Sequence, residues 1–168
     1  MKRIALISTG GTIEKTYNET AGSLANNESI LDVMLGRLQL NGVSVSRQLL
    51  MNKDSLEMTP EDHACIAQAT SKSAETYDGV VIVHGTDTLA VTGEAIYERI
   101  GMPRVPVVLT GAMRPYELRH TDALQNLTEA LLAVQLAEPG VYVAMHNCLL
   151  AFPGVGKGIG RGTFALKS

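Results

Sequence analysis

The sequence has only two cysteines, Cys65 and Cys148, and it has no long run of like charge and no long apolar run. Two cysteines do not form a disulfide framework. The 14 basic and 17 acidic residues are dispersed and give a net charge of −3, which argues against nucleic acid or an anionic membrane as a partner. The apolar runs are strand-sized, well short of the roughly 20 residues of a membrane-spanning helix. The N-terminus lacks the apolar core of a signal peptide, so we expect a cytoplasmic protein.

Short apolar runs alternate with segments of helical spacing, in a chain whose 168 residues fit one domain. Asn27 is the expected N-cap of the first helix, and Thr59 with Pro60 marks the start of the second. The Gly-rich stretch 153–162 predicts a loop. The alternation predicts an α/β fold with a doubly wound, mainly parallel sheet and helices on both faces. Strands are expected at 3–8, 43–51, 79–84, 106–110 and 141–146, and helices at 28–40, from 60 onward, at 88–100 and at 122–137.

Polar motifs follow three of the expected strands. They read STGGT at residues 8–12, HGTDT at residues 84–88 and TGAMRP at residues 110–115. In doubly wound folds, ligands bind beyond the carboxyl ends of the strands. The three motifs are therefore expected to border one crevice.

The second motif places a carboxylate beside a hydroxyl. Thr88 lies where a helix begins, so we interpret it as a structural residue that caps the helix or satisfies the backbone of the turn. Thr86 and Asp87 have a stronger functional interpretation, because an Asp could bind a cationic amine and a Thr could serve as a nucleophile. Gly85, like Gly10 and Gly11, would allow a ligand to approach the backbone, and free N–H groups at a helix start suit a carboxylate. An Asp together with such donors matches an amino acid.

Nucleotide and metal sites fit the sequence less well. The first turn lacks the spacing of a dinucleotide-binding fold, and Lys157 is followed by Gly rather than by the Ser or Thr of a P-loop. His63 and Cys65 lie two residues apart on an expected helix and therefore on different faces. His146 and Cys148 have no second cluster to complete a site. We expect no metal and no cofactor.

The two Thr-rich turns resemble those of the bacterial-type L-asparaginases. The family's first motif is matched by TGGTI at residues 9–13 and its second by HGTDT at residues 84–88. Three supporting stretches follow the family's order: DSLEMTPED at 54–62, GAMRP at 111–115 and VGKG at 155–158. The resemblance spans nearly the whole chain.

The resemblance implies a set of roles for particular residues. Thr12 matches the loop threonine that attacks the side-chain amide carbon, and Tyr17 matches the tyrosine that assists it. Thr86, Asp87 and Lys157 match a second catalytic group whose members are hydrogen-bonded together. The implied substrate-binding residues are Gly11, Ser55, Gly85, Asp87 and Ala112.

The implied reaction is hydrolysis of L-asparagine through an acyl-enzyme, with weak glutaminase activity at most. A Thr hydroxyl is a poor nucleophile at neutral pH, so a base must take its proton, and general-base help of this kind contributes roughly 10²–10⁴ in rate. Lys157 can accept a proton only in its neutral form, which partial burial favours. The backbone N–H groups of Thr12 and Thr86 are candidate donors to the oxyanion. Which of the two threonines attacks first is left open by the residues, and the resemblance favours Thr12.

Better-known members of the family are longer and carry a second domain, from which a neighbouring subunit supplies an acid to the substrate's amino group. We expect residues 1–168 to form a single asparaginase-like catalytic domain without that C-terminal domain, as a natural short form or as a piece of a longer chain. Leu56 also stands where many relatives carry a polar residue. Two alternatives therefore remain: a non-catalytic amino-acid-binding domain, and the amidase component of a larger amidotransferase. A crevice that is normally closed by a partner predicts a homo-oligomer, either a dimer or a tetramer.

Overall fold

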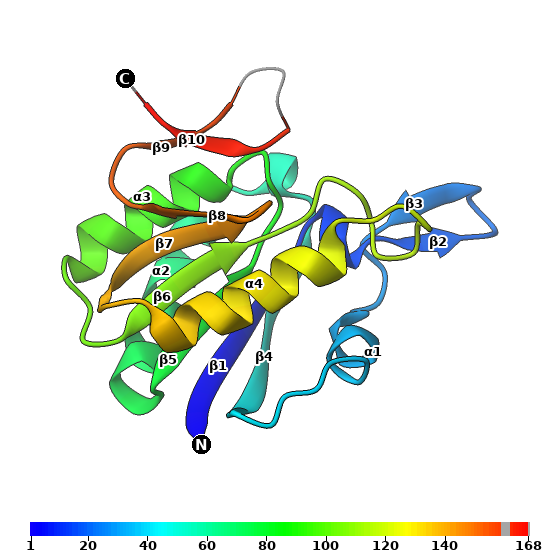
Figure 1. Ribbon diagram of the computed structural model, residues 1–168. Coiled ribbons are helices and arrows are strands. Elements are labelled where there is room, and N and C mark those ends of the chain that lie inside the picture. Colours follow the sequence, from blue (N-terminus) through cyan, green and yellow to red (C-terminus); the bar gives the residue numbers. More distant parts are fainter. Residues whose placement is uncertain (159–161, 168) are drawn as a thin grey trace.

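A six-stranded sheet forms the centre of the computed structural model, which describes residues 1–158 and 162–167 (Figure 1). The first five strands of the sheet order are parallel, and only the last pair is antiparallel. This arrangement confirms the expected doubly wound, mainly parallel sheet. Its strands, in spatial order, are β4 (Val43–Lys53), β1 (Lys2–Gly10), β5 (Gly79–Val83), β6 (Pro106–Thr110), β7 (Gly140–Met145) and β8 (Cys148–Ala151).

Helices cover both faces of the sheet, each over its own apolar core. On one face α2 (Pro60–Thr76) and α3 (Leu89–Ile100) pack against side chains such as Ile7 and Ile82. On the other face α1 (Leu31–Leu35) and α4 (Ala123–Leu136) pack against side chains such as Leu6 and Val81. Alternate residues of one strand thus enter opposite cores, which explains why the central strands are apolar throughout.

The start of α2 follows the sequence signal closely. Thr59 accepts a hydrogen bond from the Asp62 backbone N–H, and the Asp62 carboxylate accepts one from the Thr59 N–H, completing a capping box. Pro60 occupies the first turn, where its missing N–H costs nothing. Within the described residues, no helix combines the length and the apolar character needed to cross a membrane.

The first expected helix is much shorter than its apolar spacing indicated. It covers five residues, its N-cap is Ile30, and the predicted N-cap at Asn27 is therefore wrong. Tertiary contacts hold the preceding chain instead, because Ser29 donates a hydrogen bond to the Glu14 carboxylate and accepts one from Arg47. Such contacts lie outside what local periodicity can report.

Two small hairpins were not predicted. Strands β2 (Thr16–Asn18) and β3 (Ser23–Ala25) form a hairpin that projects from the body of the molecule (Figure 1). Strand β9 (Val155–Lys157) lies within residues 153–162, where a loop was expected, and pairs with β10 (Phe164–Leu166), which follows that stretch. Residues 159–161 lie outside the described part. Strands of three residues are too short for their side-chain alternation to be recognised.

Candidate active site

The ends of β1 and β5 bring the two Thr-rich turns into direct backbone contact. A Cβ atom added to Gly11 would overlap the backbone of Gly85, and one added to Gly85 would overlap the Ser55 side chain. A Cβ atom on Gly111 would overlap the His84 carbonyl and lie 3.4 Å from Thr86 Cγ2. Only Gly leaves room for such close contacts between backbones. The turns after β1, β5 and β6 therefore meet at one place, as expected for motifs at the carboxyl ends of parallel strands.

Lys157 joins this cluster from β9. Its ammonium donates hydrogen bonds to Thr86 Oγ1 at 3.0 Å and to Asp87 Oδ1 at 2.6 Å. The Lys157 side chain is 30% exposed and that of Asp87 is 43% exposed, so the ion pair lies at the surface of the crevice. The three polar groups therefore form one connected unit, although 70 residues separate Lys157 from Asp87.

The chain before β9 is anchored to α3, and this anchoring places Lys157. Phe152 lies over Gly93, where an added Cβ atom would overlap the Phe152 ring. Two residues later, the Gly154 N–H donates to the Glu94 carboxylate at 2.6 Å. Because α3 begins directly after Thr88, one helix carries the Thr86–Asp87 turn and also holds the strand that brings Lys157 to it.

Thr12 opens a single 3₁₀ turn, η1 (Thr12–Glu14), directly after Gly11. Gly11 has φ +82°, a left-handed conformation that suits Gly, and its N–H donates to the Lys53 carbonyl at 2.8 Å. Within residues 1–158 and 162–167, the N–H groups of Thr12 and Thr86 donate to no protein acceptor. Neither N–H group is therefore committed to a protein acceptor in this part of the chain.

Ser55 and Thr88 belong to a second contact beside the turn. Ser55 is buried at the start of a 3₁₀ turn, η2 (Ser55–Glu57), whose N-terminus is capped by Asp54. Thr88 donates its hydroxyl to the Ser55 carbonyl at 3.0 Å and makes no side-chain cap on α3. Thr88 is the N-cap residue of α3, so its structural interpretation is confirmed, but the hydroxyl bonds the Ser55 segment to the HGTDT turn and not an N–H of the helix. Ala112 is buried and follows Gly111 in the same cluster.

Tyr17 lies apart from these groups. Its side chain is 59% exposed on β2, and its N–H donates to the Glu117 carboxylate at 3.2 Å. At the base of the hairpin, Lys15 Nζ pairs with Asp54 Oδ2 at 2.6 Å. The Lys15 ammonium is the main reason that the pKa of the Asp54 carboxyl lies below its usual range. The hairpin that carries Tyr17 is thereby tied to the segment that carries Ser55.

Two buried features were missed by the sequence analysis. Glu14 is fully buried beneath η1, and burial raises the pKa of its carboxyl while the Ser29 hydroxyl and Arg47 oppose that rise. His84, although part of the HGTDT motif, was assigned no role. It is fully buried and hydrogen-bonded to Thr92, which also contacts His63. In both cases the sequence offered one signal of a buried titratable group, which is a Glu or His side chain shortly after an apolar strand.

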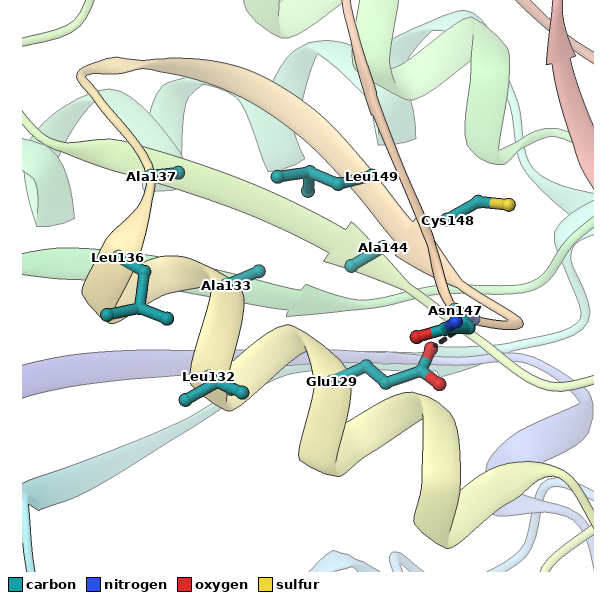
Figure 2. Close-up of a pocket in the computed structure, with 9 residues that line it drawn as sticks. All are labelled: Glu129, Leu132, Ala133, Leu136, Ala137, Ala144, Asn147, Cys148 and Leu149. Carbon is teal, nitrogen blue, oxygen red and sulfur yellow. Dashed lines mark hydrogen bonds between the residues drawn. The ribbon is translucent and has the colours of Figure 1, made fainter.

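A pocket of about 320 Å³ lies away from this cluster, between α4 and the β7–β8 hairpin (Figure 2). Figure 2 shows mainly apolar side chains around it, with one polar contact, from the Asn147 N–H to the Glu129 carboxylate at 2.8 Å. Its lining includes one carboxylate, Glu129, and one thiol, Cys148, but in the described part of the chain no base is paired with either of them to support catalysis. In the described ranges, 1–158 and 162–167, no three His, Cys, Asp or Glu side chains are grouped to hold a metal ion.

Fold and site together define an α/β protein of the doubly wound class, with its reactive groups where such folds bind small ligands. Comparison with known proteins identifies the family. The family model described as "Asparaginase, N-terminal" matches residues 3–167. The chain belongs to the asparaginase family.

Several relatives illustrate the similarity. The L-asparaginase of Thermococcus kodakarensis is 34% identical over 99% of this chain and 51% of its own length. A glutamyl-tRNA(Gln) amidotransferase subunit of Thermoplasma acidophilum is 31% identical over 86% of this chain and 36% of its own length. Among solved structures, the thermostable L-asparaginase from T. kodakarensis matches with a TM-score of 0.85, at 34% identity, over 98% of this chain and 51% of that structure. The probable cytoplasmic L-asparaginase from Campylobacter jejuni matches with a TM-score of 0.75, at 33% identity, over 94% of this chain and 48% of that structure. The chain thus spans about half the length of these L-asparaginases.

The buried imidazole of His84 predicts a specific pH dependence of stability. Burial lowers the pKa of His84 from 6.5 to about 4. Between these values the unfolded chain binds more protons than the folded chain, so stability must rise with pH across this window and fall as pH drops through it. The full shift corresponds to about 3 kcal/mol. Burial also lowers the pKa of His63, which acts in the same direction.

Urea unfolding of the wild type and of the variants His84→Asn and His120→Asn at several pH values measures this effect. We expect the free energy of unfolding of His84→Asn to lose most of its rise between pH 4 and 6.5. The His120→Asn variant, with the substitution in an exposed loop, should keep it. Equal slopes in all three proteins would contradict the assignment.

Proposed function

We propose that residues 1–168 form one catalytic domain that hydrolyses L-asparagine to L-aspartate and ammonia. The observation that carries this proposal is the hydrogen-bonded unit of Thr86, Asp87 and Lys157 beside the Gly11–Thr12 turn. The membership of the chain in the asparaginase family supports it. The same crevice offers a hydroxyl nucleophile, a carboxylate for an ammonium group and free backbone N–H groups for a developing oxyanion.

In the first step, Thr12 Oγ1 attacks the side-chain amide carbon of asparagine, and its proton is passed on to the amide nitrogen. Negative charge moves to the amide oxygen, where the free N–H groups of Thr12 and Thr86 can receive it. Each such donor contributes about 10²–10³ in rate. With the proton from Thr12, the amide nitrogen leaves as ammonia when the C–N bond breaks, and an ester of Thr12 remains. Closure of the hairpin would bring Tyr17 to the Thr12 hydroxyl.

In the second step, the oxygen of a water molecule bonds to the ester carbon, a proton of that water returns to Thr12 Oγ1 as the ester C–O bond breaks, and aspartate is released. Thr86 is placed to direct this water, since its hydroxyl oxygen already accepts from Lys157 and its own proton is free to be donated. The ammonium charge of Lys157 lies beside the Thr86 hydroxyl and stabilises negative charge that develops on the reacting oxygens next to it. Lys157 in turn is held by Asp87, so removal of either charge is expected to leave the other without its partner.

The α-amino and α-carboxylate groups of the substrate have separate candidate partners. Asp87 is 43% exposed and can accept a hydrogen bond from the substrate ammonium in addition to the one from Lys157. Ser55 is held against Gly85, which places its hydroxyl and the nearby backbone N–H groups for a carboxylate. Ala112 lies on the Thr86 side, where the leaving amide would be received. No metal or cofactor enters this scheme.

The relatives named as glutamyl-tRNA(Gln) amidotransferase subunits favour a second candidate function. In that case the domain would hydrolyse an amide and supply ammonia to a partner protein. The chain covers 36% of the length of one such relative, against 51% of the L-asparaginase relative. Ammonia release that appears only after a partner protein is added would favour this candidate. Binding of asparagine without turnover would instead favour a non-catalytic binding domain.

Substitution of the two threonines tests the catalytic assignment. We expect Thr12→Ala and Thr86→Ala each to lower kcat by about 10³ or more, because each removes a hydroxyl that reacts or directs water. Lys157→Met should lower kcat by about 10²–10³, because it removes the positive charge beside the Thr86 hydroxyl. Ammonia release from asparagine measures all three, and Thr128→Ala on the exposed face of α4 serves as the control. Full activity in both Thr12→Ala and Thr86→Ala would refute the assignment.

Selectivity provides an independent test. Glutamine is longer than asparagine by one methylene, a difference worth about 1–3 kcal/mol, or about 10–200-fold in kcat/KM. We expect kcat/KM for asparagine to exceed that for glutamine by a factor in this range. Parallel assays of the two substrates with one enzyme preparation measure the ratio, and a ratio of one would contradict the expectation.

We also propose that the protein forms a homo-oligomer, a dimer or a tetramer, in the cytoplasm. Exposed apolar side chains on α4 and β8 support an interface between copies: Leu132 is 55% exposed, Leu136 74% and Leu149 46%. Light scattering should give a mass of two or four chains. Leu136→Glu should reduce that mass, whereas Met102→Glu, at an exposed site after α3, should not. A wild-type mass of one chain would overturn the proposal.

A further inference from the structure

Three buried side chains form a continuous line of hydrogen bonds behind the HGTDT turn. His63 Nδ1 on α2 lies 2.6 Å from Thr92 Oγ1 on α3, and the same oxygen lies 2.7 Å from His84 Nε2. The other ring nitrogen of His84, Nδ1, lies 2.8 Å from the carbonyl oxygen of Gly85. The line therefore runs from the first turn of α2, by way of the first turn of α3, to the backbone beside Thr86.

The donors and acceptors along this line have only one consistent arrangement when both imidazoles are neutral. The Gly85 carbonyl can only accept, so His84 Nδ1 must carry the proton and His84 Nε2 must accept. Thr92 has a single hydroxyl proton, which must then go to His84 Nε2. Its oxygen consequently accepts from His63 Nδ1–H. Burial favours the neutral form of both rings, which lie nearly parallel with their centroids 6.2 Å apart.

The end of the line meets a peptide group at a glycine. Gly85 lacks a Cβ and has the wide intrinsic backbone freedom of glycine, so its orientation depends on its packing against Gly11 and Ser55 and on the hydrogen bond from His84. The Gly85–Thr86 peptide is trans, and its carbonyl and N–H therefore point in opposite directions. With the carbonyl held by His84, the Thr86 N–H points away from the imidazole. Rotation of this peptide would break the His84 contact and misplace that N–H.

We propose that Thr92 and His63, acting through His84, are positioning residues that fix the Gly85–Thr86 peptide for the reaction, an inference that rests on the proposed amide hydrolysis. Thr92 lies at the centre of the line because its hydroxyl both accepts and donates. None of the three side chains contacts the substrate in this scheme. Their effect is on the Thr86 N–H and, through it, on the charge that develops in the transition state.

A valine in place of Thr92 removes both hydrogen bonds at nearly constant volume. Thr92→Val should lower kcat for asparagine by about tenfold or more, with KM changed much less, because a displaced oxyanion donor acts on the transition state. Thr92→Ser keeps the hydroxyl and should restore kcat to within about threefold of the wild type. The matched control is Thr70→Val, which removes a buried Thr hydroxyl on α2 that donates only to the Ile66 carbonyl. That control should lower stability and leave kcat unchanged.

Imidazole ¹⁵N spectra of the wild type test the line without any assay. We expect His84 and His63 both to carry their proton on Nδ1 at neutral pH. A proton on His84 Nε2 would overturn the arrangement. An inactive wild type would refute the proposed hydrolysis itself. An active wild type with equal kcat in Thr92→Val, measured where that variant is fully folded, would refute only the positioning role.

Discussion

The contact on which the proposed chemistry depends is the one between the Lys157 ammonium and the Thr86–Asp87 pair. It joins a strand near the end of the described chain to a turn at the centre of the sheet. A surface ion pair of this kind contributes little to stability, with a typical value of about 0–1 kcal/mol. Its importance is geometric, since it sets the charge beside the Thr86 hydroxyl. Two other contacts, of Phe152 with Gly93 and of the Gly154 N–H with the Glu94 carboxylate, hold the strand that carries Lys157 in place.

Close backbone packing makes a small site possible in this fold. At Gly11, Gly85 and Gly111, side chains are absent where turns from β1, β5 and β6 must meet. Because Gly is conformationally permissive, these turns have little intrinsic restraint. The interior compensates with buried polar contacts, among them the line from His63 to the Gly85 carbonyl and the Thr88 hydroxyl on the Ser55 carbonyl. A fully satisfied polar network in a dry interior restricts the backbone to one arrangement.

Much of the fold and of the candidate site was predictable from the sequence. The predictions that failed did so for physical reasons that the structure shows. Continuous apolar strands such as β5 and a complete capping box at Thr59 are local signals, and the structure confirmed both. The juxtaposition of the motifs followed from one rule about parallel sheets. The contacts of Ser29 with Glu14 and Arg47, and the use of Thr88, arise from tertiary hydrogen bonds that no local pattern encodes. The roles of Thr12 and Tyr17 come from family resemblance, and the structure places Tyr17 on a projecting hairpin.

A structure of the protein with bound L-aspartate is the most direct test of the central claim, because the reaction product would mark the site. The account predicts the side-chain carboxylate of aspartate between the hydroxyls of Thr12 and Thr86, with its ammonium group at Asp87 and its α-carboxylate at Ser55. Aspartate bound elsewhere, for instance in the apolar pocket beside α4, with the Thr86 turn empty, would contradict it.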